Sequence, residues 1–151
     1  MPDHMSLSAK EIVDRLRLSP HPEGGWYRQT WAAAPPPEAP DARPAGTAIY
    51  YLLAEGQKSH WHRVDSTEIW HFYGGAPLDL RMARTAAGPA ELVCLGPNLS
   101  AGEVPQAIVP AGHWQAARST GAWSLVGCTV SPGFRFDGFE LAPPDFDIPD
   151  G

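Results

Sequence analysis

The feature that most constrains the fold is a succession of short strand-like runs, each ended by turn-forming residues. The runs are rich in β-branched and aromatic residues, and turns of Gly, Pro, Asn and Ser separate them in a chain with 17 prolines and 15 glycines. We expect strands at about residues 26–31, 47–54, 59–64, 68–73, 78–83, 90–95, 106–109, 115–119, 123–130 and 134–141. Many short strands at regular intervals indicate an all-β sandwich or barrel.

Only one helix is expected, near the N-terminus. Ser8 and Glu11 fit a capping box, and Ile12 and Leu16 follow at a helix-like apolar spacing. The pattern predicts a short helix over residues 9–16.

Prolines cluster in two places outside the expected barrel, at residues 32–45 and 143–151. We interpret the first as a mobile surface loop that is dispensable for folding, and the second as a tail that lies over the surface or is disordered. The 151 residues are then one domain, 1–151, with a barrel core at about 24–142.

Composition excludes several classes of partner. The formal net charge is −6 and no basic stripe exists to meet phosphates, so a nucleic-acid partner is not expected. No apolar run is long enough to span a membrane, and no secretory signal pattern opens the chain, so we expect a cytoplasmic protein. Cys94 and Cys128 lie in apolar runs and are expected to be buried free thiols.

Residues 56–75 hold the strongest candidate site. His60 and His62 are two apart, and residues at that spacing on a strand face the same side, so both imidazoles are expected to point into one space. Glu68 opens the next strand after a short polar turn and can return beside them. Two imidazoles and a carboxylate suit a divalent metal or proton transfer.

The same alternation gives further pocket residues. Trp70 and Phe72 share the face of Glu68 and predict an aromatic wall, and Gln115 faces inward from a later strand. The Gly-rich loop before the first long strand adds Glu23 as a candidate for substrate binding, and the strand that follows adds Tyr27 and Arg28.

These segments resemble the cupin superfamily, whose first motif has a glycine, a His-x-His pair, a glutamate and a closing glycine. A partial second motif follows at residues 110–115. The chain is more closely similar to a small single-domain cupin subfamily of largely unknown function with an epimerase-like fold. The matching segments are residues 20–27, 47–53, 61–64, 68–71, 109–115 and 125–134. The resemblance covers roughly residues 8–142 and implies a double-stranded β-helix, or jelly roll.

Two positions depart from the motifs. Five residues separate His62 from Glu68, a longer spacing than metal-binding cupins usually have. Gln115 stands where the second motif usually supplies a histidine, and Gln is a weaker ligand for a transition metal than imidazole.

Three functions are compatible with these residues. The favoured one is an isomerase or epimerase acting on a sugar-like or keto substrate. By analogy with sugar-nucleotide epimerases of related fold, His62 is the base, Glu68 orients it, and Tyr51 is the acid, with Tyr27 and Tyr50 as alternatives.

The second function is a metal-dependent oxygenase or lyase, with His60, His62, Glu68 and Gln115 around iron, manganese, nickel or zinc. The third is a protein that binds a small metabolite without catalysis. A homodimer is expected in every case, because the strand at 26–31 lies apart from the main run and can pair across subunits.

Overall fold

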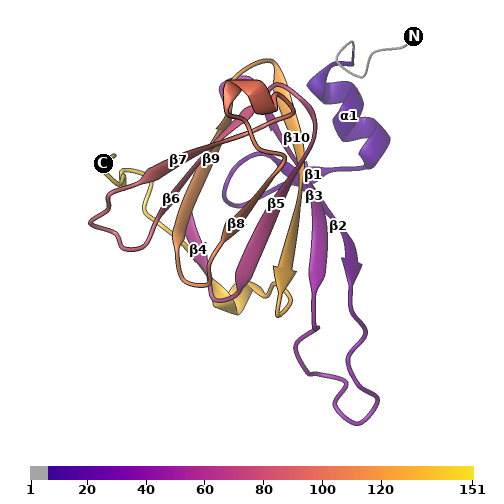
Figure 1. Ribbon diagram of the computed structural model, residues 1–151. Helices are drawn as coiled ribbons and strands as arrows, with labels where there is room; N and C mark the ends of the chain where they lie inside the picture. The colour runs from indigo at the N-terminus through magenta and orange to yellow at the C-terminus, as the bar shows by residue number, and fades with distance from the viewer. Residues whose placement is uncertain (1–6) are drawn as a thin grey trace.

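The computed structural model describes residues 7–151. Helix α1 spans Ala9–Leu16, as the capping box predicts. The Ser8 hydroxyl accepts a hydrogen bond from the Glu11 amide at 3.1 Å, and the Glu11 carboxylate accepts one from the Ser8 amide at 3.2 Å. Ile12 on the buried face packs with Leu52 and Trp123, so the helix covers one end of the barrel (Figure 1).

Two antiparallel sheets form the body of the molecule (Figure 1). The first sheet, here sheet A, has the order β1 (Ser19–Pro20), β2 (Trp26–Ala32), β3 (Thr47–Ala54), β10 (Trp123–Ser131), β5 (Thr67–Gly75) and β8 (Gln106–Val109). The second, sheet B, has the order β11 (Phe139–Leu141), β4 (Lys58–Val64), β9 (Trp114–Ser119), β6 (Leu78–Ala83) and β7 (Glu91–Leu95). The expected all-β double-stranded β-helix with one short N-terminal helix is confirmed.

One expected strand is mostly absent. Residues 134–141 were predicted as a strand, but only β11 is extended there, and a short 3-10 helix, Phe136–Gly138, precedes it. A strand would send Phe136 and Phe139 to opposite faces. The helical turn instead brings Phe134, Phe136 and Phe139 into mutual edge contact, with ring centroids 4.9 to 6.1 Å apart.

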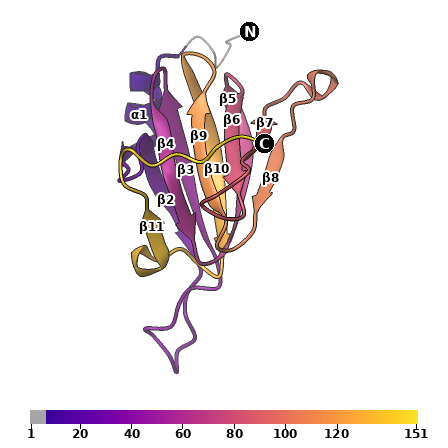
Figure 2. The ribbon, with the colours of Figure 1, turned by 90° about the vertical axis from the view of Figure 1, so that its left-hand side faces the viewer.

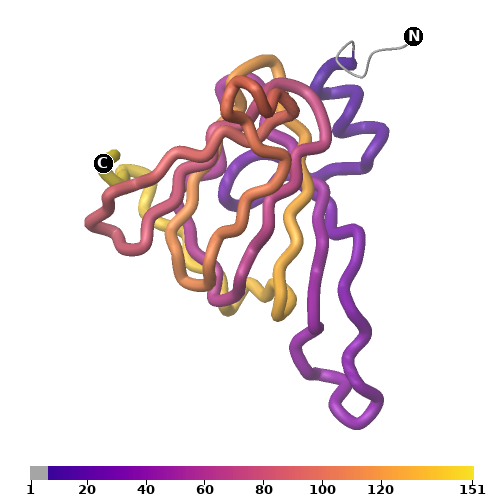
Figure 3. The backbone as a smooth tube through the Cα atoms, in the orientation of Figure 1, coloured from indigo at the N-terminus to yellow at the C-terminus, as the bar shows by residue number. Residues whose placement is uncertain are grey.

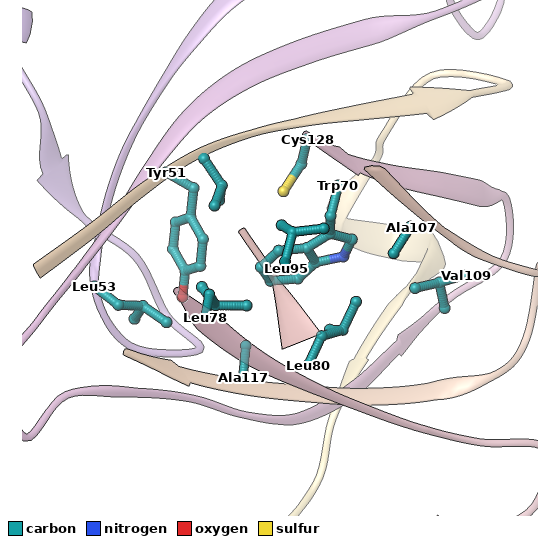
Figure 4. Packing of buried hydrophobic residues seen from close by; sticks show 11 residues of the cluster. Tyr51, Leu53, Trp70, Leu78, Leu80, Leu95, Ala107, Val109, Ala117 and Cys128 are labelled. Atoms are coloured by element: carbon teal, nitrogen blue, oxygen red, sulfur yellow. The ribbon is translucent and has the colours of Figure 1, made fainter. Parts of the chain in front are cut away.

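The hydrophobic core lies between the two sheets. Trp70 and Tyr51 from sheet A meet Leu78, Leu80 and Ala117 from sheet B (Figure 4). Trp70 and Tyr51 are each 1% exposed and pack edge to face at 5.9 Å. This packing fills one end of the barrel with apolar groups, and the polar cavity described below lies outside it.

Strands β2 and β3 continue into a long loop that projects from the body (Figure 3). The loop was predicted to be mobile, and the structure anchors its returning end. Arg43 donates hydrogen bonds to Asp65 at 2.6 and 3.0 Å and to the Gly133 carbonyl at 2.5 Å. Strand β2 pairs with β3 of the same chain, while β1 covers only Trp26 and Tyr27 on its other side. Pairing of the rest of that edge with a second copy stays a prediction.

The C-terminal tail crosses the outer face of sheet B (Figure 2). Ile148 is fully buried, and Phe146 packs against Trp114 at 5.0 Å. Asp150 forms a parallel bridge with Ala90. The tail thus lies over the outer face of sheet B. Within residues 7–151, no helix is long and apolar enough to cross a membrane.

Candidate active site

A β-bulge in strand β4 decides which of its residues face the barrel interior. Ser59 pairs with Ala117 and His62 pairs with Gln115, so His60 and Trp61 together stand opposite Ala116 alone. Two residues against one reverse the alternation of the strand at that point. Ser59 and His62 therefore both point inward, although they are three residues apart, and both are buried.

The bulge corrects the expectation that His60 and His62 share one space. His60 lies on the outer face, where its Nε2 is 2.7 Å from the Pro143 carbonyl oxygen. Trp61 is also outward and is buried beneath the tail with Ile148. The local sequence alternates normally, so nothing in it marks the extra residue.

The loop of residues 21–25 brings Glu23 to β4. Gly24 and Gly25 have φ values of +114° and +76°, and a Cβ on Gly24 would lie 2.1 Å from the Lys58 carbonyl oxygen. Only glycine fits that approach. The His60 amide donates to the Glu23 carbonyl at 2.8 Å, which fixes the loop against β4.

Glu23 and His62 form the centre of the site. Glu23 Oε2 is 3.2 Å from His62 Nε2 and accepts a hydrogen bond from the Ser59 hydroxyl. His62 Nδ1 is 2.8 Å from the His60 carbonyl oxygen, which can only accept, so Nδ1 carries a hydrogen and Nε2 is the titrating nitrogen. One proton is therefore shared between Nε2 and the Glu23 carboxyl.

Burial decides where that proton rests. Loss of solvent raises the pKa of Glu23 to about 8 and lowers the pKa of His62. Both directions favour the neutral pair, with the proton on Glu23 and an unprotonated Nε2 facing it. At neutral pH Glu23 is thus a carboxylic acid that can donate.

His21 supports the same state of Glu23. The Glu23 amide donates to His21 Nδ1 at 3.1 Å, so this nitrogen is unprotonated. Burial and the neighbouring His62 lower the pKa of His21 to about 4, which keeps its ring neutral. Glu23 Oε1 is 3.3 Å from the same Nδ1, and its repulsion with the nitrogen lone pair is smaller when the carboxyl is neutral than when it is ionised.

A second carboxyl faces the cavity from β5. Glu68 Oε1 accepts a hydrogen bond from Gln115 Nε2 at 2.8 Å, and Gln115 Oε1 accepts one from Trp70 Nε1 at 2.7 Å. The indole N–H can only donate, so Trp70 fixes which end of the Gln115 amide faces Glu68. Burial raises the pKa of Glu68 to about 7, while His62 opposes the rise.

These groups open into a cavity of about 190 Å³ between the sheets. Its lining comes from the 21–25 loop, strands β2, β3, β4, β5 and β10 and the segment before β11: His21, Glu23, Tyr27, Gln29, Thr47, Ile49, His62, Val64, Glu68, Cys128, Val130, Phe134 and Phe136. Polar side chains form part of this surface, and aliphatic and aromatic side chains form much of the rest.

The structure brings together four of the predicted site residues, Glu23, Tyr27, His62 and Glu68. Other predicted residues lie elsewhere. The Tyr51 hydroxyl donates to the Gly24 carbonyl at 2.5 Å and belongs to the core, as does Trp70, and Phe72 packs against that core. All three side chains belong to the apolar core that adjoins the cavity, and none of them lines it.

Two further candidates are also placed away from the cavity. Arg28 points outward, donates to the Leu16 carbonyl at 2.7 Å and lies over the Tyr50 ring, so it fastens the helix to sheet A. Gln115 is buried behind Glu68 and does not line the cavity. His71 is on the outer face of sheet A, where its Nε2 is 3.0 Å from the Thr129 hydroxyl.

The predicted metal centre does not fit these positions. His60 faces outward, and the Gln115 oxygen is occupied by the Trp70 N–H. Only His62 and Glu68 of the four expected ligands reach the cavity. In the part of the chain from residue 7 onward, no group of three or more His, Cys, Asp or Glu side chains is arranged to hold a metal ion.

His21, Ser59 and the phenylalanine segment were not among the predicted site residues. A histidine two residues before Glu23 in a Pro- and Gly-rich loop was a usable signal for His21. Ser59 becomes inward-facing only through the bulge. The phenylalanines were assigned to a strand, so their gathering at the cavity had no signal in the period-two pattern.

The architecture and the site define the class of protein: a double-stranded β-helix with an internal polar cavity. The chain belongs to the cupin superfamily, because the family model described as "Cupin superfamily (DUF985)" matches residues 10–142. The resemblance stated from the motifs is thereby confirmed.

Solved structures of similar proteins agree. A protein from Shewanella oneidensis is 38% identical over 90% of this chain and 85% of its own, with a TM-score of 0.83. A hypothetical protein from Leishmania major is 32% identical over 90% of this chain and 88% of its own, with a TM-score of 0.80. A mutant of Bacillus subtilis oxalate decarboxylase is 12% identical, covers 81% of this chain and 29% of its own, has a TM-score of 0.59 and supports the fold alone. A comparison with curated proteins finds no match.

Proposed function

We propose that this cupin catalyses proton transfer at a carbon next to a carbonyl group, the chemistry of an isomerase or epimerase. The observation that carries the proposal is the pair of buried carboxyl groups at one cavity, Glu23 and Glu68, with pKa values moved to about 8 and about 7. Carboxyl groups with separated pKa values near neutrality are an arrangement suited to acid–base catalysis.

The two carboxyls take different roles between these pKa values. Glu68 is then mostly ionised and accepts a proton, while Glu23 is mostly protonated and donates one. The hydrogen bond from Gln115 favours the ionised form of Glu68. The unprotonated His62 Nε2 can accept a hydrogen bond from the Glu23 carboxyl, so the contact favours the protonated form of Glu23.

In the proposed reaction, Glu68 and Glu23 between them take up and supply every proton that moves. Glu68 takes the proton of a C–H bond next to the carbonyl, and the electron pair of that bond moves to form an enol. Glu23 gives its proton to the carbonyl oxygen, and the Ser59 hydroxyl, which donates to Glu23 Oε2, stabilises the carboxylate that is left. Glu68 then returns its proton to the other carbon while the Glu23 carboxylate takes the proton of the adjacent hydroxyl, which gives the isomer and restores both carboxyls. Delivery of that proton to the opposite face of the first carbon, with Glu23 taking back the enol proton, gives the epimer.

Deuterium exchange tests this proposal without knowledge of the physiological substrate. Small hydroxyketones are incubated with the protein in D₂O, and loss of the C–H signal is followed by proton NMR. We expect protein-dependent exchange that is greatest between about pH 7 and about pH 8, where one carboxyl is protonated and the other is not. Glu68→Gln should abolish it, because an amide cannot take up the proton.

Leu99→Ala is the matched control, since Leu99 is 69% exposed and lies outside the cavity lining. The exchange rate of the ketones in buffer without protein gives the background. If the protein binds the ketones but exchange does not exceed this background at any pH, the catalytic proposal is contradicted. That result would leave the third function, a protein that binds a small metabolite without turning it over.

A further inference from the structure

The cavity lining contains acidic side chains but no lysine or arginine among residues 7–151. Its ionisable side chains are two carboxyls, Glu23 and Glu68, two imidazoles, His21 and His62, with the Tyr27 phenol and the Cys128 thiol. Both imidazoles are kept neutral by burial, which lowers their pKa values. No lysine or arginine of residues 7–151 lines the cavity.

Cations beside the cavity are committed to other partners. Arg43 contacts the Gly133 carbonyl next to Phe134, but its guanidinium forms an ion pair with Asp65 at 2.6 Å. Arg28 follows Tyr27 in the chain, yet it points outward to the Leu16 carbonyl. Arg135, between Phe134 and Phe136, donates to the Asp41 carbonyl at 2.9 Å and does not line the cavity. Within residues 7–151, a negatively charged ligand would therefore meet no basic side chain in the lining itself.

The remaining lining suits an apolar group. Phe134 and Phe136 pack edge to face at 4.9 Å, and Ile49, Val64 and Val130 contribute aliphatic surface. Phe136 is 55% exposed, so this aromatic part lies at the open side of the cavity. The cavity therefore offers apolar surface in addition to its polar groups.

The size of the cavity limits the ligand. Its volume of about 190 Å³ is below the roughly 300 Å³ at which pockets for drug-sized ligands begin. It is comparable to the roughly 150 Å³ cavity that holds a benzene molecule in an engineered protein. A sugar nucleotide is far larger than this space.

We propose that the cavity selects a small uncharged hydroxyketone or hydroxyaldehyde with an apolar portion, and rejects carboxylated and phosphorylated compounds. The carbonyl end meets Glu23 and Glu68, and the apolar portion meets Phe134 and Phe136. An anion would lose its hydration and approach two carboxyl groups without a compensating charge, which is costly in a buried site. This inference names the substrate class of the proposed function and rests on it for the position of the carbonyl group.

Matched ligand pairs test the charge rule. The first pair is α-hydroxyacetophenone and mandelate, which share a phenyl ring and a hydroxyl group, and mandelate has a carboxylate in place of the ketone. The second is dihydroxyacetone and its phosphate. Dissociation constants are measured at neutral pH by NMR titration of the labelled protein, and the shifted signals are mapped onto the cavity. We expect each neutral member to bind at least roughly 10-fold more tightly than its anion.

Two variants connect the result to the lining. Gln29→Lys places a cation at an exposed position of the cavity rim, and we expect it to improve mandelate binding while leaving α-hydroxyacetophenone nearly unchanged. Phe136→Ala should weaken α-hydroxyacetophenone and leave dihydroxyacetone nearly unchanged, since only the former has a ring to meet. Leu92→Ala, at a position that is 62% exposed and outside the cavity, is the control.

The outcomes separate this inference from the proposed function. Equal or tighter binding of either anion overturns the substrate class, as does the failure of both neutral compounds to shift cavity signals. Neutral selectivity without deuterium exchange supports the substrate class and contradicts the catalytic proposal. Exchange of an anionic ketone such as dihydroxyacetone phosphate, with tight binding, contradicts the substrate class and supports the proton-transfer chemistry.

Discussion

His60 and His62 are two residues apart on one strand, yet they occupy opposite sides of the barrel wall. His62 is inside, fully enclosed between Glu23 and its own strand, with a lowered pKa. His60 is outside, beside the tail residue Pro143. The difference arises from one extra residue opposite Ala116, and it teaches that a bulge can remove a ligand from a motif without changing its sequence.

The largest expected effect comes from exchanging these two histidines for glutamine. His62→Gln should lower the deuterium-exchange rate by roughly 100-fold or more, because glutamine cannot hold a proton for Glu23 at neutral pH. His60→Gln should change the rate by less than about 2-fold, since its ring only touches the tail. Both rates are measured with the same hydroxyketone, and equal losses in the two variants would refute the inside–outside contrast.

The pH dependence of stability is the next effect in size. Glu23 and Glu68 have raised pKa values, so the folded chain holds their protons above pH 4.5, where the unfolded chain releases them. Stability from these groups is present at low pH and is lost as the pH rises toward about 8. Below pH 6.5 the lowered pKa of His21 acts in the opposite direction, because the unfolded histidine binds a proton that the folded one does not.

The free energy of unfolding should therefore fall by about 2 kcal/mol between about pH 6.5 and about pH 8. Urea unfolding at several pH values measures this slope. Glu23→Gln should flatten it, because the amide stays neutral in both states. Asp79→Asn on the outer face is the control, and an unchanged slope in Glu23→Gln would assign the pH dependence to other groups.

Two tryptophans provide a smaller contrast, because the Trp70 N–H donates inside the barrel and the Trp61 N–H donates on its outer face. Trp70→Phe leaves the Gln115 oxygen unpaired in the core, so its amide can turn and present oxygen to Glu68. The pKa of Glu68 should rise, the acidic limb of the exchange profile should move to higher pH, and the rate at neutral pH should fall by roughly 10-fold. Trp61→Phe removes a hydrogen bond to Asp147 on the outer face and should leave the profile in place.

The sequence predicted most of the barrel because periodicity is a local property. Helix 9–16 and strands 78–83 and 106–109 have the expected limits, since caps, turns and alternation define them residue by residue. The expected strand 134–141 failed because contacts among three phenylalanines outweighed the alternating pattern.

The site was predicted only in part, for a related reason. His62 and Glu68 follow from the motif, and Glu23 from its glycine-rich loop. The outward turn of His60 depends on the packing of Trp61 beneath a tail more than eighty residues away in the chain, as the hydrogen bond to Asp147 illustrates. The orientation of Gln115 depends on Trp70, 45 residues earlier. Such long-range partners leave no mark in a local pattern.

A substitution under the C-terminal tail tests whether the outer face of sheet B affects stability without affecting the cavity. Ile148 is fully buried against sheet B, and Ile148→Val should lower the free energy of unfolding by about 1 kcal/mol through the lost methyl group. Deuterium exchange should not change, because the tail contacts the side of the wall opposite the cavity. Thermal unfolding and the exchange assay are run on the same preparation, and a slower exchange rate would show that the two faces are coupled.

The smallest effect is expected for the projecting loop, where its tip and its anchored end should differ. Removal of residues 34–40, which are mostly exposed, should change the free energy of unfolding by less than about 0.5 kcal/mol. Arg43→Ala should cost more, up to about 1 kcal/mol, because Arg43 joins Asp65 to the Gly133 carbonyl beside the phenylalanine segment. The same variant should weaken α-hydroxyacetophenone more than dihydroxyacetone, since Arg43 holds the backbone that positions Phe134. If the deletion is the more costly change, the loop tip packs on the barrel and the ion pair is not its anchor.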